Sequence, residues 1–386
     1  MSKDIYCGRG DRVSFTDFMD LISVSFDHDP SEAFFETLLP KLYREELRPQ
    51  DQNYVVTEDG VPAAAVGAYD HELIVCGRSL RCRGVGNVAV HPEHRSKGYM
   101  KATMNAALQD MIADGVVLSA LGGKRQRYQY FGYDKAGPIY TYSVSRDNIR
   151  HVYADLTAPY TVKEVIEKGD AVIDQILALN RKEPMIAVRP REEYLAIAMS
   201  WNAKLLAFFD GERFVGYCVL SKSGIVTEVQ AVEDEAFMPL VRSVSAYFDG
   251  KCSVCLLPHQ LRYREELTRI AEGISLDHMA SFNVLCYRAV IEAFLALKLS
   301  YTTLPDGEMT LLIHGYAGDE RIRVCVKNGE PFVEKADDSV SFDYELEHTE
   351  AINFLFAPFS PMREMASDVA RLWFPLPLCT LRADKV

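Results

Sequence analysis

The sequence predicts a mixed α/β protein made of three consecutive units. The first unit contains, at residues 85–121, an apolar strand, a polar turn, a helical run and a second apolar strand in that order. A second segment, up to about residue 285, repeats this plan weakly. A third segment places one helical stretch before several strand-like stretches and two further helical stretches. Strands that alternate with helices in this way predict layered α/β units with a mixed sheet.

Composition and charge narrow the class of protein. The chain has 386 residues, 48% of them hydrophobic, which suits two or three soluble domains. No apolar run approaches the roughly 18 residues of a membrane span, and the first residues lack an apolar signal core, so we expect a cytoplasmic protein. The net charge of −13 argues against nucleic acid or an anionic membrane as the main partner. It fits a cationic substrate and simple acidic solubility equally well.

The cysteines and histidines predict no metal site. The nine cysteines form no disulfide framework, which suits reduced thiols. Cys252 and Cys255 are the one suggestive pair, but they lie in a predicted strand, where positions three apart face opposite sides. His91 and His94 lie in a polar turn without an obvious third ligand, so we expect them to be solvated.

The first unit is expected to begin with helical segments and a hairpin. Within residues 1–54, apolar residues recur at helical spacing around Phe18 and again, after a proline, at Phe34 and Phe35. Residues 54–68 predict a hairpin that turns at Asp59-Gly60. Residues 73–83 and 139–144 predict two further strands of the same sheet.

Residues 85–121 carry the chemistry of this unit. The strand at residues 85–90 follows Gly84 and contains Gly86; a turn at 91–98 leads into a helix at 99–113 and a strand at 116–121. Free backbone N–H groups at a helix N-terminus, with the positive end of the helix dipole, suit a phosphate. Gly98 lets the backbone approach an anion because it has no Cβ. Arg95 and Lys97 add positive charge.

The second unit keeps this plan but loses the basic turn. Residues 163–180 and 192–198 predict helices, and residues 205–220 predict a hairpin around Asp210-Gly211. Residues 225–232 resemble the strand at 85–90, but the acidic sequence Glu233-Asp234-Glu235 follows them. An acidic turn repels a phosphate, so this unit is expected to be structural.

The third unit is expected to begin near Cys286 with a helix at residues 287–299. Strands are predicted at residues 308–315, 321–326, 331–334 and 339–346, and helices at 349–357 and 361–372. The sequence Phe374-Pro375-Leu376-Pro377-Leu378 follows, and its two prolines exclude a long helix there.

The turn and its neighbours resemble a known family. Arg95-Ser96-Lys97-Gly98-Tyr99-Met100 resembles the pyrophosphate turn of the GNAT N-acetyltransferases, Arg/Gln-x-x-Gly-x-Gly/Ala. Met100 replaces the small final residue, so its side chain must turn away from the cofactor. Residues 125–133 add the family's Tyr-x-x-x-Gly spacing. Together with the second unit, which lacks the motif, and the tail at residues 374–378, these features make the whole chain resemble the Eis-like (enhanced intracellular survival) acetyltransferases.

This resemblance implies tandem GNAT folds, the second degenerate, followed by a sterol-carrier-protein-like α/β domain. The implied domains are residues 1–147 (active), 148–285 (degenerate) and 286–386 (the C-terminal domain that supplies the tail). The implied reaction transfers an acetyl group from acetyl-CoA directly to a primary amine in a ternary complex. The amine would belong to a small cationic molecule, aminoglycoside- or polyamine-like, or to a lysine side chain. The protein is expected to be a homo-oligomer, with a hexamer as one candidate.

The resemblance also implies roles for single residues. The pantetheine arm would follow the strand backbone, and the pyrophosphate would bind the amides of the turn, which gives as cofactor-binding residues Val88, Ala89, Val90, Arg95, Ser96, Lys97, Gly98, Tyr99, Met100 and Lys101. Tyr128 matches the family's acid, which protonates the departing thiolate. That role is chemically sensible because a phenol with a pKa of ~10 and a thiol with a pKa of ~8.5 are comparable acids. Tyr130 and Tyr133 are the neighbouring alternatives.

The chain end supplies the second implied catalytic group. In this family the terminal carboxylate, here that of Val386, enters the active site of the first domain. Because its pKa of ~3.5 makes it a weak base for an ammonium group of pKa ~10, it would act through water or hold the cation while a neutral fraction reacts. The substrate-binding candidates between the early helices and the tail are Asp27, Asp29, Phe34, Phe35 and Glu36. Two other functions stay open: a sensor that binds acetyl-CoA without turnover, and a lipid carrier that works through the third domain.

Overall fold

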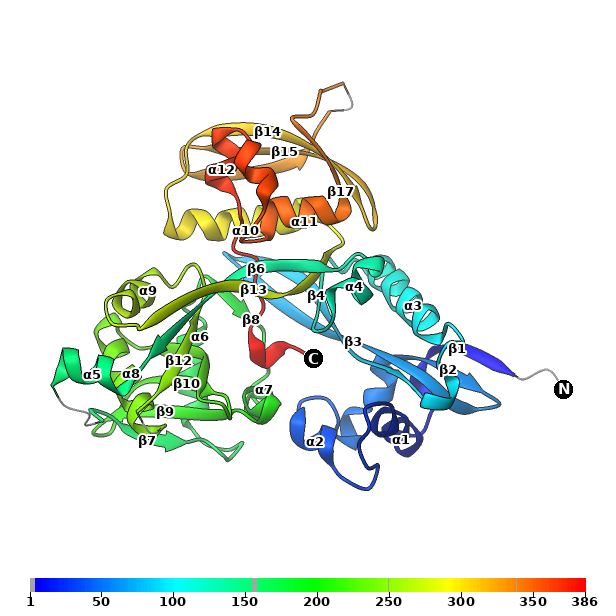
Figure 1. The fold of residues 1–386 in the computed structure, drawn as a ribbon, viewed down its shortest axis with the longest axis horizontal. Helices are drawn as coiled ribbons and strands as arrows, with labels where there is room; N and C mark the ends of the chain where they lie inside the picture. The colour runs from blue at the N-terminus through cyan, green and yellow to red at the C-terminus, as the bar shows by residue number, and fades with distance from the viewer. Residues whose placement is uncertain (1–3, 155–157, 249, 338) are drawn as a thin grey trace.

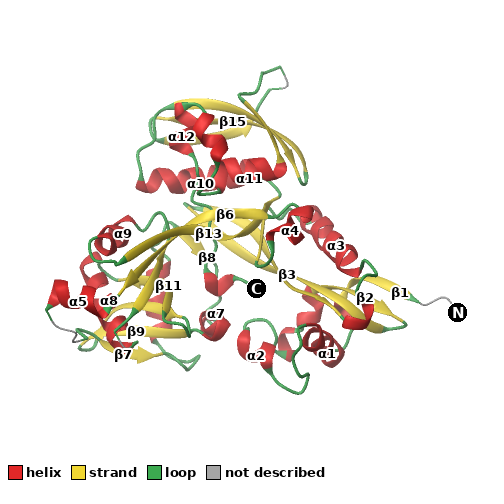
Figure 2. Ribbon diagram, in the orientation of Figure 1, coloured by secondary structure: helices red, strands yellow, loops and turns green. Residues whose placement is uncertain are grey.

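The structure, a computed structural model, describes residues 4–154, 158–248, 250–337 and 339–386. Within these ranges a 13-stranded sheet runs through the first two segments of the chain, and a 4-stranded sheet belongs to the third segment. Figure 1 shows the third segment above the other two, with the C-terminus at the centre, between the first and second segments. Figure 2 shows helices on both faces of the long sheet.

The first segment forms the right-hand part of the long sheet in Figure 1. Its strands are β1 (Ile5–Arg9), β2 (Asn53–Glu58), β3 (Val61–Val75), β4 (Arg78–Val90), β5 (Leu118–Leu121) and β6 (Asp134–Val144), and its helices are α1 (Phe15–Ser25), α2 (Phe34–Leu38), α3 (Tyr99–Ala113) and α4 (Arg125–Tyr128). The predicted helix at residues 99–113 and the hairpin that turns at Asp59-Gly60 are confirmed. The expectation of helices throughout residues 1–54 is wrong at β1, which pairs with β2.

The stretch at residues 73–83 is a hairpin and not the single strand that its sequence predicts. β3 ends at Val75 and β4 begins at Arg78, with Cys76 and Gly77 between them. Both turn residues have positive φ, 46° and 78°, which is the geometry that lets a two-residue turn match the twist of its strands. Apolar residues continue on both sides of this turn because the tip of the hairpin packs into the core of the third segment.

Strand alternation gives the sheet of the first segment two different faces. On one face Val66 and Val85 pack with residues of α3. On the other face Ala65 and Ala89 pack with residues of α1 and α2. A ligand that reaches this sheet from the α3 side therefore meets different side chains from one that reaches it from the α1 side.

The second segment forms the left-hand part of the long sheet in Figure 1. Its elements are α5 (Arg146–Tyr153), β7 (Thr161–Glu164), α6 (Val172–Asn180), β8 (Met185–Ala187), α7 (Tyr194–Met199), β9 (Lys204–Asp210), β10 (Arg213–Leu220), β11 (Ile225–Ala231), α8 (Phe237–Tyr247), β12 (Cys252–Leu256), α9 (Leu261–Thr268) and β13 (Gly273–Val284). The hairpin at Asp210-Gly211 is confirmed. The single helix predicted at residues 163–180 is wrong: β7 comes first and pairs with β9, and only then does α6 begin, with Asp170 accepting a hydrogen bond from the amide of Val172.

Strands β6 and β13 join the two segments into one sheet. β13 lies between β5 and β6, while β6 also pairs with β12. The strand that closes the second segment therefore completes the sheet of the first, a pairing between parts of the chain that are far apart in sequence.

The third segment packs two layers of helix and sheet. It contains α10 (Tyr287–Tyr301), β14 (Gly307–Gly315), β15 (Gly318–Lys327), β16 (Glu330–Lys335), β17 (Tyr344–Glu347), α11 (His348–Phe356) and α12 (Asp368–Trp373). The strand predicted at residues 339–346 is shorter than expected, and the helix predicted at 361–372 is divided into a 3-10 turn and α12. The division occurs at Ser367, whose side chain caps α12.

The tail leaves the third segment after α12 and descends between the other two (Figure 1). Its first residues are fixed by hydrogen bonds: the amide of Leu376 donates to the carbonyl of Leu355 at 2.8 Å, and Lys298 Nζ donates to the carbonyl of Trp373 at 2.8 Å. In the part of the chain that the structure describes, no helix is both long and apolar enough to cross a membrane.

Candidate active site

The site is built where two parallel strands of the first segment separate. β4 and β5 are paired from Cys82 with Leu118 to Val85 with Leu121. Beyond Val85, β4 continues to Val90, and its ladder with β3 is shifted by a bulge. A strand that has lost its neighbour offers backbone groups to a ligand that lies along it.

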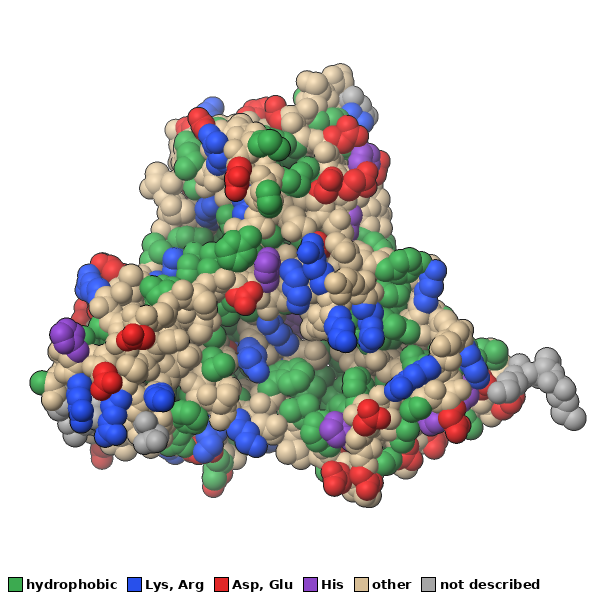
Figure 3. All heavy atoms as spheres, in the orientation of Figure 1, with side chains coloured by type: hydrophobic (Ala, Val, Ile, Leu, Met, Phe, Trp, Pro, Cys, Tyr) green, Lys and Arg blue, Asp and Glu red, His purple; other side chains and the backbone are tan. Residues whose placement is uncertain are grey.

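A hollow of about 910 Å³ lies beside this opening and is lined by most of the predicted cofactor-binding residues. Those that line it are Val88, Val90, Arg95, Ser96, Gly98, Tyr99, Met100 and Lys101. Gly98 is the N-cap of α3 and has a φ of 82°, so the turn delivers free amide groups of the helix N-terminus to the hollow. Figure 3 shows Lys and Arg side chains gathered near the middle of the visible face, which gives an acidic protein a local basic region.

Two of the predicted cofactor residues, Ala89 and Lys97, do not line the hollow. The Ala89 side chain is buried on the α1 side of the sheet. Lys97 Nζ donates to Glu58 Oε1 at 2.6 Å, and Glu58 also contacts His94 Nδ1 at 2.9 Å and Tyr99 OH at 2.5 Å. The buried Glu58 carboxylate therefore holds the turn in place through its contacts with His94, Lys97 and Tyr99. The expectation that His94 is solvated is wrong for this reason.

The three tyrosines that compete for the acid role occupy different surroundings. Tyr128 is buried and packs in one cluster with Val85 and Leu121, the last residues paired before the strands separate. Burial raises the pKa of Tyr128, while the nearby Arg127 lowers it. Tyr130 is 63% exposed and lines the hollow. Tyr133 is buried, and its hydroxyl is already hydrogen bonded to Ser119 Oγ at 2.7 Å.

The C-terminal residue lies against two glycines of β4. A Cβ placed on Gly86 would be 2.9 Å from the terminal carboxyl carbon of Val386, and a Cβ on Gly84 would be 2.8 Å from Val386 Cγ2. The chain end can occupy this place only because both positions lack a side chain. The structure thus brings Val386 to the first segment, where its carboxyl group lies close to the point at which β4 and β5 separate.

Val386 and Tyr128 lie on opposite faces of β4. Gly84 pairs with Tyr69, whose side chain is buried in the cluster beneath α1. Val85, the next residue along β4, packs with Tyr128 and α3 on the other face. A group bound in the hollow and a group bound on the α1 side would therefore meet at the opening between the strands.

Three residues that the sequence analysis missed hold the tail in place. Lys41 Nζ donates to the carbonyls of Ala383 at 2.6 Å and Lys385 at 2.7 Å. Trp201 Nε1 donates to the same Lys385 carbonyl at 3.2 Å. Arg189 forms an ion pair with the buried Asp384 at 2.9 Å. No local pattern marks these residues, because each one acts on a segment far away in the sequence.

The pKa of Lys41 is lowered to about 7, mainly by burial; Asp384 opposes this shift and Arg189 adds to it. The unfolded chain holds this proton up to the ordinary lysine pKa of ~10.4, so between about pH 7 and 10 the unfolded state binds more protons than the folded state. Stability should then rise with pH by up to about 1.4 kcal/mol per pH unit on account of this one group. Below pH ~7 both states are protonated and this contribution becomes constant.

Lys41→Met is expected to remove that rise while it weakens the anchoring of the tail. Urea unfolding of the variant and the parent protein at pH 8, 9 and 10 measures the difference in slope. Lys222→Met, at an exposed turn, is the matched control and should leave the slope unchanged. Equal slopes for the Lys41 variant and the parent would show that the buried lysine keeps its ordinary pKa.

The predicted substrate residues are only partly brought together. Phe34 and Phe35 share a cluster with Val386 and Trp201, and Phe34 stacks on His28 with ring centroids 3.6 Å apart. Glu36 has a buried carboxylate oxygen, Oε2, without a hydrogen-bond partner in the described structure. Asp27 is exposed at a residue of positive φ.

The carboxylate of the neighbouring Asp29 is hydrogen bonded to a residue of its own loop. Its carboxylate accepts from the amide and the hydroxyl of Ser31, and these bonds lower the pKa of Asp29.

Within the described ranges, no group of three or more His, Cys, Asp or Glu side chains is placed to hold a metal ion. Cys252 is buried and Cys255 partly buried, and both are free thiols.

Comparison with known proteins defines the class of the first segment. Residues 11–136 match the family model described as acetyltransferase (GNAT) domain. No curated protein matches the sequence. The matched domain makes this chain an N-acetyltransferase.

Solved structures share the fold along nearly the whole chain. They include a GCN5-related N-acetyltransferase from Anabaena variabilis (13% identity, TM-score 0.69, 98% of each chain covered). Another is a GCN5-related N-acetyltransferase from Kribbella flavida (16% identity, TM-score 0.67, 100% of this chain and 99% of that chain). A third is Eis1 from Mycobacterium abscessus (15% identity, TM-score 0.59, 100% of each chain). At these identities the likeness shows a shared mixed α/β fold.

Proposed function

We propose that the protein is an Eis-like acetyltransferase that transfers an acetyl group from acetyl-CoA to a primary amine. The amine belongs to a small cationic molecule, aminoglycoside- or polyamine-like, or to a lysine side chain. One observation carries this proposal: the carboxyl group of Val386 lies against Gly86 at the opening between β4 and β5, on the face opposite Tyr128. This arrangement supports the role of Tyr128 as the acid and of the Val386 carboxylate as the acceptor-side group, on the two sides of one opening.

The hollow is the proposed binding site of a cofactor that carries a diphosphate group. Its pyrophosphate would bind the amides from Arg95 to Met100, where the helix dipole of α3 adds to the charges of Arg95 and Lys101. The pantetheine arm would follow the backbone of β4 from Val90 toward Val88, so that the thioester reaches the opening. Met100 lines the hollow and also packs against the cluster that contains Val85 and Tyr128.

Gly98→Val tests this placement, since Gly98 has a φ of 82° and nothing lies within 4 Å of a Cβ built there. The bulkier residue is expected to weaken acetyl-CoA binding by several-fold or more. Gly115→Val, at the other end of α3 with a φ of 71°, introduces comparable backbone strain away from the hollow. Calorimetric titration should show weakened binding for the first variant alone, with one acetyl-CoA per chain in the parent protein. Equal affinities in both variants, or a stoichiometry of two, would contradict the proposed site.

On the acceptor side, the neutral amine attacks the thioester carbonyl carbon and forms the new C–N bond. The C–S bond then breaks, the thiolate takes the proton of the Tyr128 hydroxyl, and the proton of the amine passes to the carboxylate of Val386, directly or through water. Glu36, with its unpaired buried oxygen, and the rings of Phe34 and Phe35 would bind the cationic substrate before transfer.

The three segments would have the separate roles that the resemblance implies. Residues 1–147 form the active GNAT domain, residues 148–285 a degenerate GNAT-like domain, and residues 286–386 a sterol-carrier-like domain that delivers the tail. We place the enzyme in the cytoplasm as a homo-oligomer, a hexamer being one candidate, with no nucleic acid or membrane as partner and no metal in the reaction.

Thiol release from acetyl-CoA in the presence of a panel of amines tests the function. The panel contains polyamines, aminoglycosides and a lysine peptide, with the matching alcohols as controls. Amine-dependent thiol release supports the proposal. Binding of acetyl-CoA without release under any amine would instead identify a sensor, and native mass spectrometry that finds a bound lipid would favour a carrier.

A further inference from the structure

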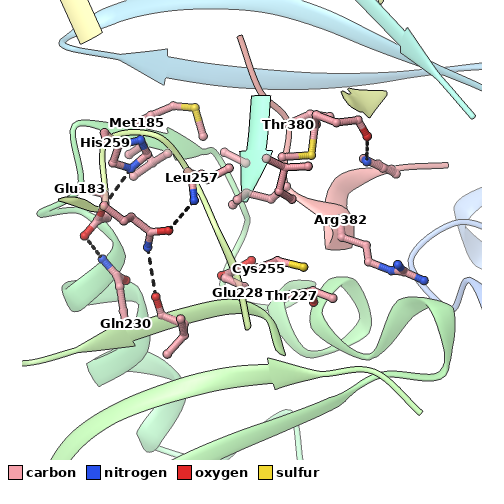
Figure 4. Close-up of a pocket in the computed structure, with 18 of the residues that line it drawn as sticks. Glu183, Met185, Thr227, Glu228, Gln230, Cys255, Leu257, His259, Thr380 and Arg382 are labelled. Atoms are coloured by element: carbon pink, nitrogen blue, oxygen red, sulfur yellow. Dashed lines mark hydrogen bonds and ion pairs between the residues drawn. The ribbon is translucent and has the colours of Figure 1, made fainter. Parts of the chain in front are cut away.

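The last turn of the tail packs against the second segment. This 3-10 turn, Arg382–Asp384, contacts α7 and β11. A pocket of about 310 Å³ lies beside it, and Figure 4 shows Thr380 and Arg382 of the tail near the strand that carries Glu228. Only two residues after this turn, Val386 lies against the two glycines of β4 in the first segment. The second segment therefore holds the tail immediately before the chain end reaches the candidate active site.

One side chain of the turn, Asp384, makes a two-point contact with the second segment. Arg189 Nε donates to Asp384 Oδ1 at 2.9 Å, and Arg189 Nη2 donates to Asp384 Oδ2 at 2.9 Å. The two side chains are only 3% and 7% exposed. Two parallel hydrogen bonds between a guanidinium and a carboxylate fix the orientation of the groups as well as their distance.

The Asp384 carboxylate is charged in this buried place. Burial by itself raises the pKa of Asp384, but the charge and the hydrogen bonds of Arg189 outweigh that effect. The charges of Lys41 and His71 act in the same direction as Arg189, so the pKa of Asp384 is lowered overall. The contact is therefore an ion pair at neutral pH.

The other edge of the Arg189 guanidinium is bound as firmly. Its Nη1 donates to Glu228 Oε1 at 3.0 Å and its Nη2 donates to Glu228 Oε2 at 2.8 Å. The hydroxyl of Tyr217 donates to Glu228 Oε1 at 2.7 Å. Because the guanidinium is planar and rigid, it holds the carboxylates of Glu228 and Asp384 at a fixed angle to each other. A rotation of Arg189 would leave at least one buried carboxylate without its partner.

The backbone that carries Arg189 is tied to the sheet of the first segment. β8 pairs with β3 from Leu73 with Ala187 to Val75 with Met185, and the amide of Val188 donates to the carbonyl of Glu72 at 2.9 Å. β3 in turn pairs with β4, the strand against which the chain end lies. Arg189, the next residue after Val188, is thereby held at a fixed place relative to β4.

We propose that Arg189 is a positioning residue for acetyl transfer, which fixes the carboxylate of Val386 at the opening between β4 and β5 by binding Asp384. This inference rests on the proposed function, in which that carboxylate takes part in the reaction. The two residues after Asp384 span at most about 7 Å, at roughly 3.3–3.6 Å each, so a displacement of Asp384 moves the carboxylate as well. The second segment, although it lacks a basic cofactor turn, thus contributes to the reaction of the first.

Two variants weaken the contact in different ways. Asp384→Asn keeps the shape of the side chain, removes its charge and leaves Arg189 paired with Glu228. Arg189→Lys keeps the positive charge but cannot make the two-point contact. Each is expected to lower kcat at least ten-fold and to leave the affinity for acetyl-CoA unchanged, because the cofactor hollow is not touched.

Asp170→Asn is the matched control, since it removes another ion pair of the second segment, with Lys163 at 2.6 Å, that does not involve the tail. Steady-state kinetics should give parent-like turnover for this variant. Parent-like turnover in both the Asp384 and the Arg189 variants would overturn the proposal.

A double-variant cycle separates positioning of the carboxylate from a general effect on the fold. A few Gly and Ser residues added after Val386 displace the carboxylate by themselves. If Arg189 and Asp384 act through that carboxylate, Asp384→Asn in the extended protein should lower kcat less than two-fold further. Losses that multiply in the doubly altered protein would overturn the proposal.

A crystal structure of the Asp384→Asn protein tests the same point without any measurement of activity. The carboxyl group of Val386 is expected to lie about 1 Å or more from its place beside Gly86. An unchanged position would overturn the proposal. The proposed function fails separately, by the absence of amine-dependent thiol release in the parent protein.

Discussion

Replacing Tyr128 by Phe is expected to lower turnover by about 10²–10⁴-fold, the usual cost of losing a general acid. The substitution keeps the ring, which packs with Val85 and Leu121, and removes only the hydroxyl proton. Acetyl-CoA affinity should therefore change little. Because burial raises the pKa of Tyr128, the hydroxyl stays protonated throughout the neutral range and turnover should not fall there as pH rises.

Steady-state kinetics with the best amine of the panel measures turnover, and calorimetry measures the affinity for acetyl-CoA. Tyr130→Phe is the matched control, since Tyr130 is exposed at the hollow and belongs to the same short segment. A Tyr128 variant that retains more than half of the parent turnover, with a strongly impaired Tyr130 variant, would transfer the acid role to Tyr130.

Moving the chain end is expected to lower turnover by roughly ten-fold to 100-fold, because displacements of about 1 Å at a reacting group already cost that much. Gly86→Ala places a methyl group where the carboxyl carbon of Val386 would be only 2.9 Å away, so the carboxylate must shift. Gly273→Ala, at a position with open space around it, is the control. Thermal stability and acetyl-CoA binding should be similar in both variants.

Two changes at the tail itself test the same idea without touching β4. A few Gly and Ser residues added after Val386 move the charge and crowd the site. Removal of Lys385 and Val386 leaves the new carboxylate some 7 Å short, at about 3.3–3.6 Å per residue. An N-terminal tag serves as the control for added chain. Full activity in the extended protein would mean that the terminal carboxylate has no part in the reaction, and the base would then be sought among Asp27, Asp29 and Glu36.

Local sequence patterns predicted the elements that carry the cofactor chemistry. The bounds of α3 and the place of Gly98 before it follow from helical periodicity and from a turn that only a residue tolerant of positive φ can make easily. The β2–β3 hairpin followed in the same way from Asp59-Gly60. Such patterns were less informative where apolar residues continue through a turn, as at Cys76-Gly77, because both arms of that hairpin are buried.

The sequence by itself therefore determined the turn, the helix behind it and the strands that precede it, since each depends on residues a few positions apart. Only the tertiary structure decided which residues surround the reacting groups. Lys41 anchors the tail across 342 residues, Gly84 and Gly86 admit Val386, and Gln230 and His259 meet at Glu183. The contacts of the tail depend on β13, which joins the two halves of the sheet, and on the course of the tail between those halves. Short-range periodicity carries no information about which distant segments pack together, because that choice is made by the burial of the whole chain.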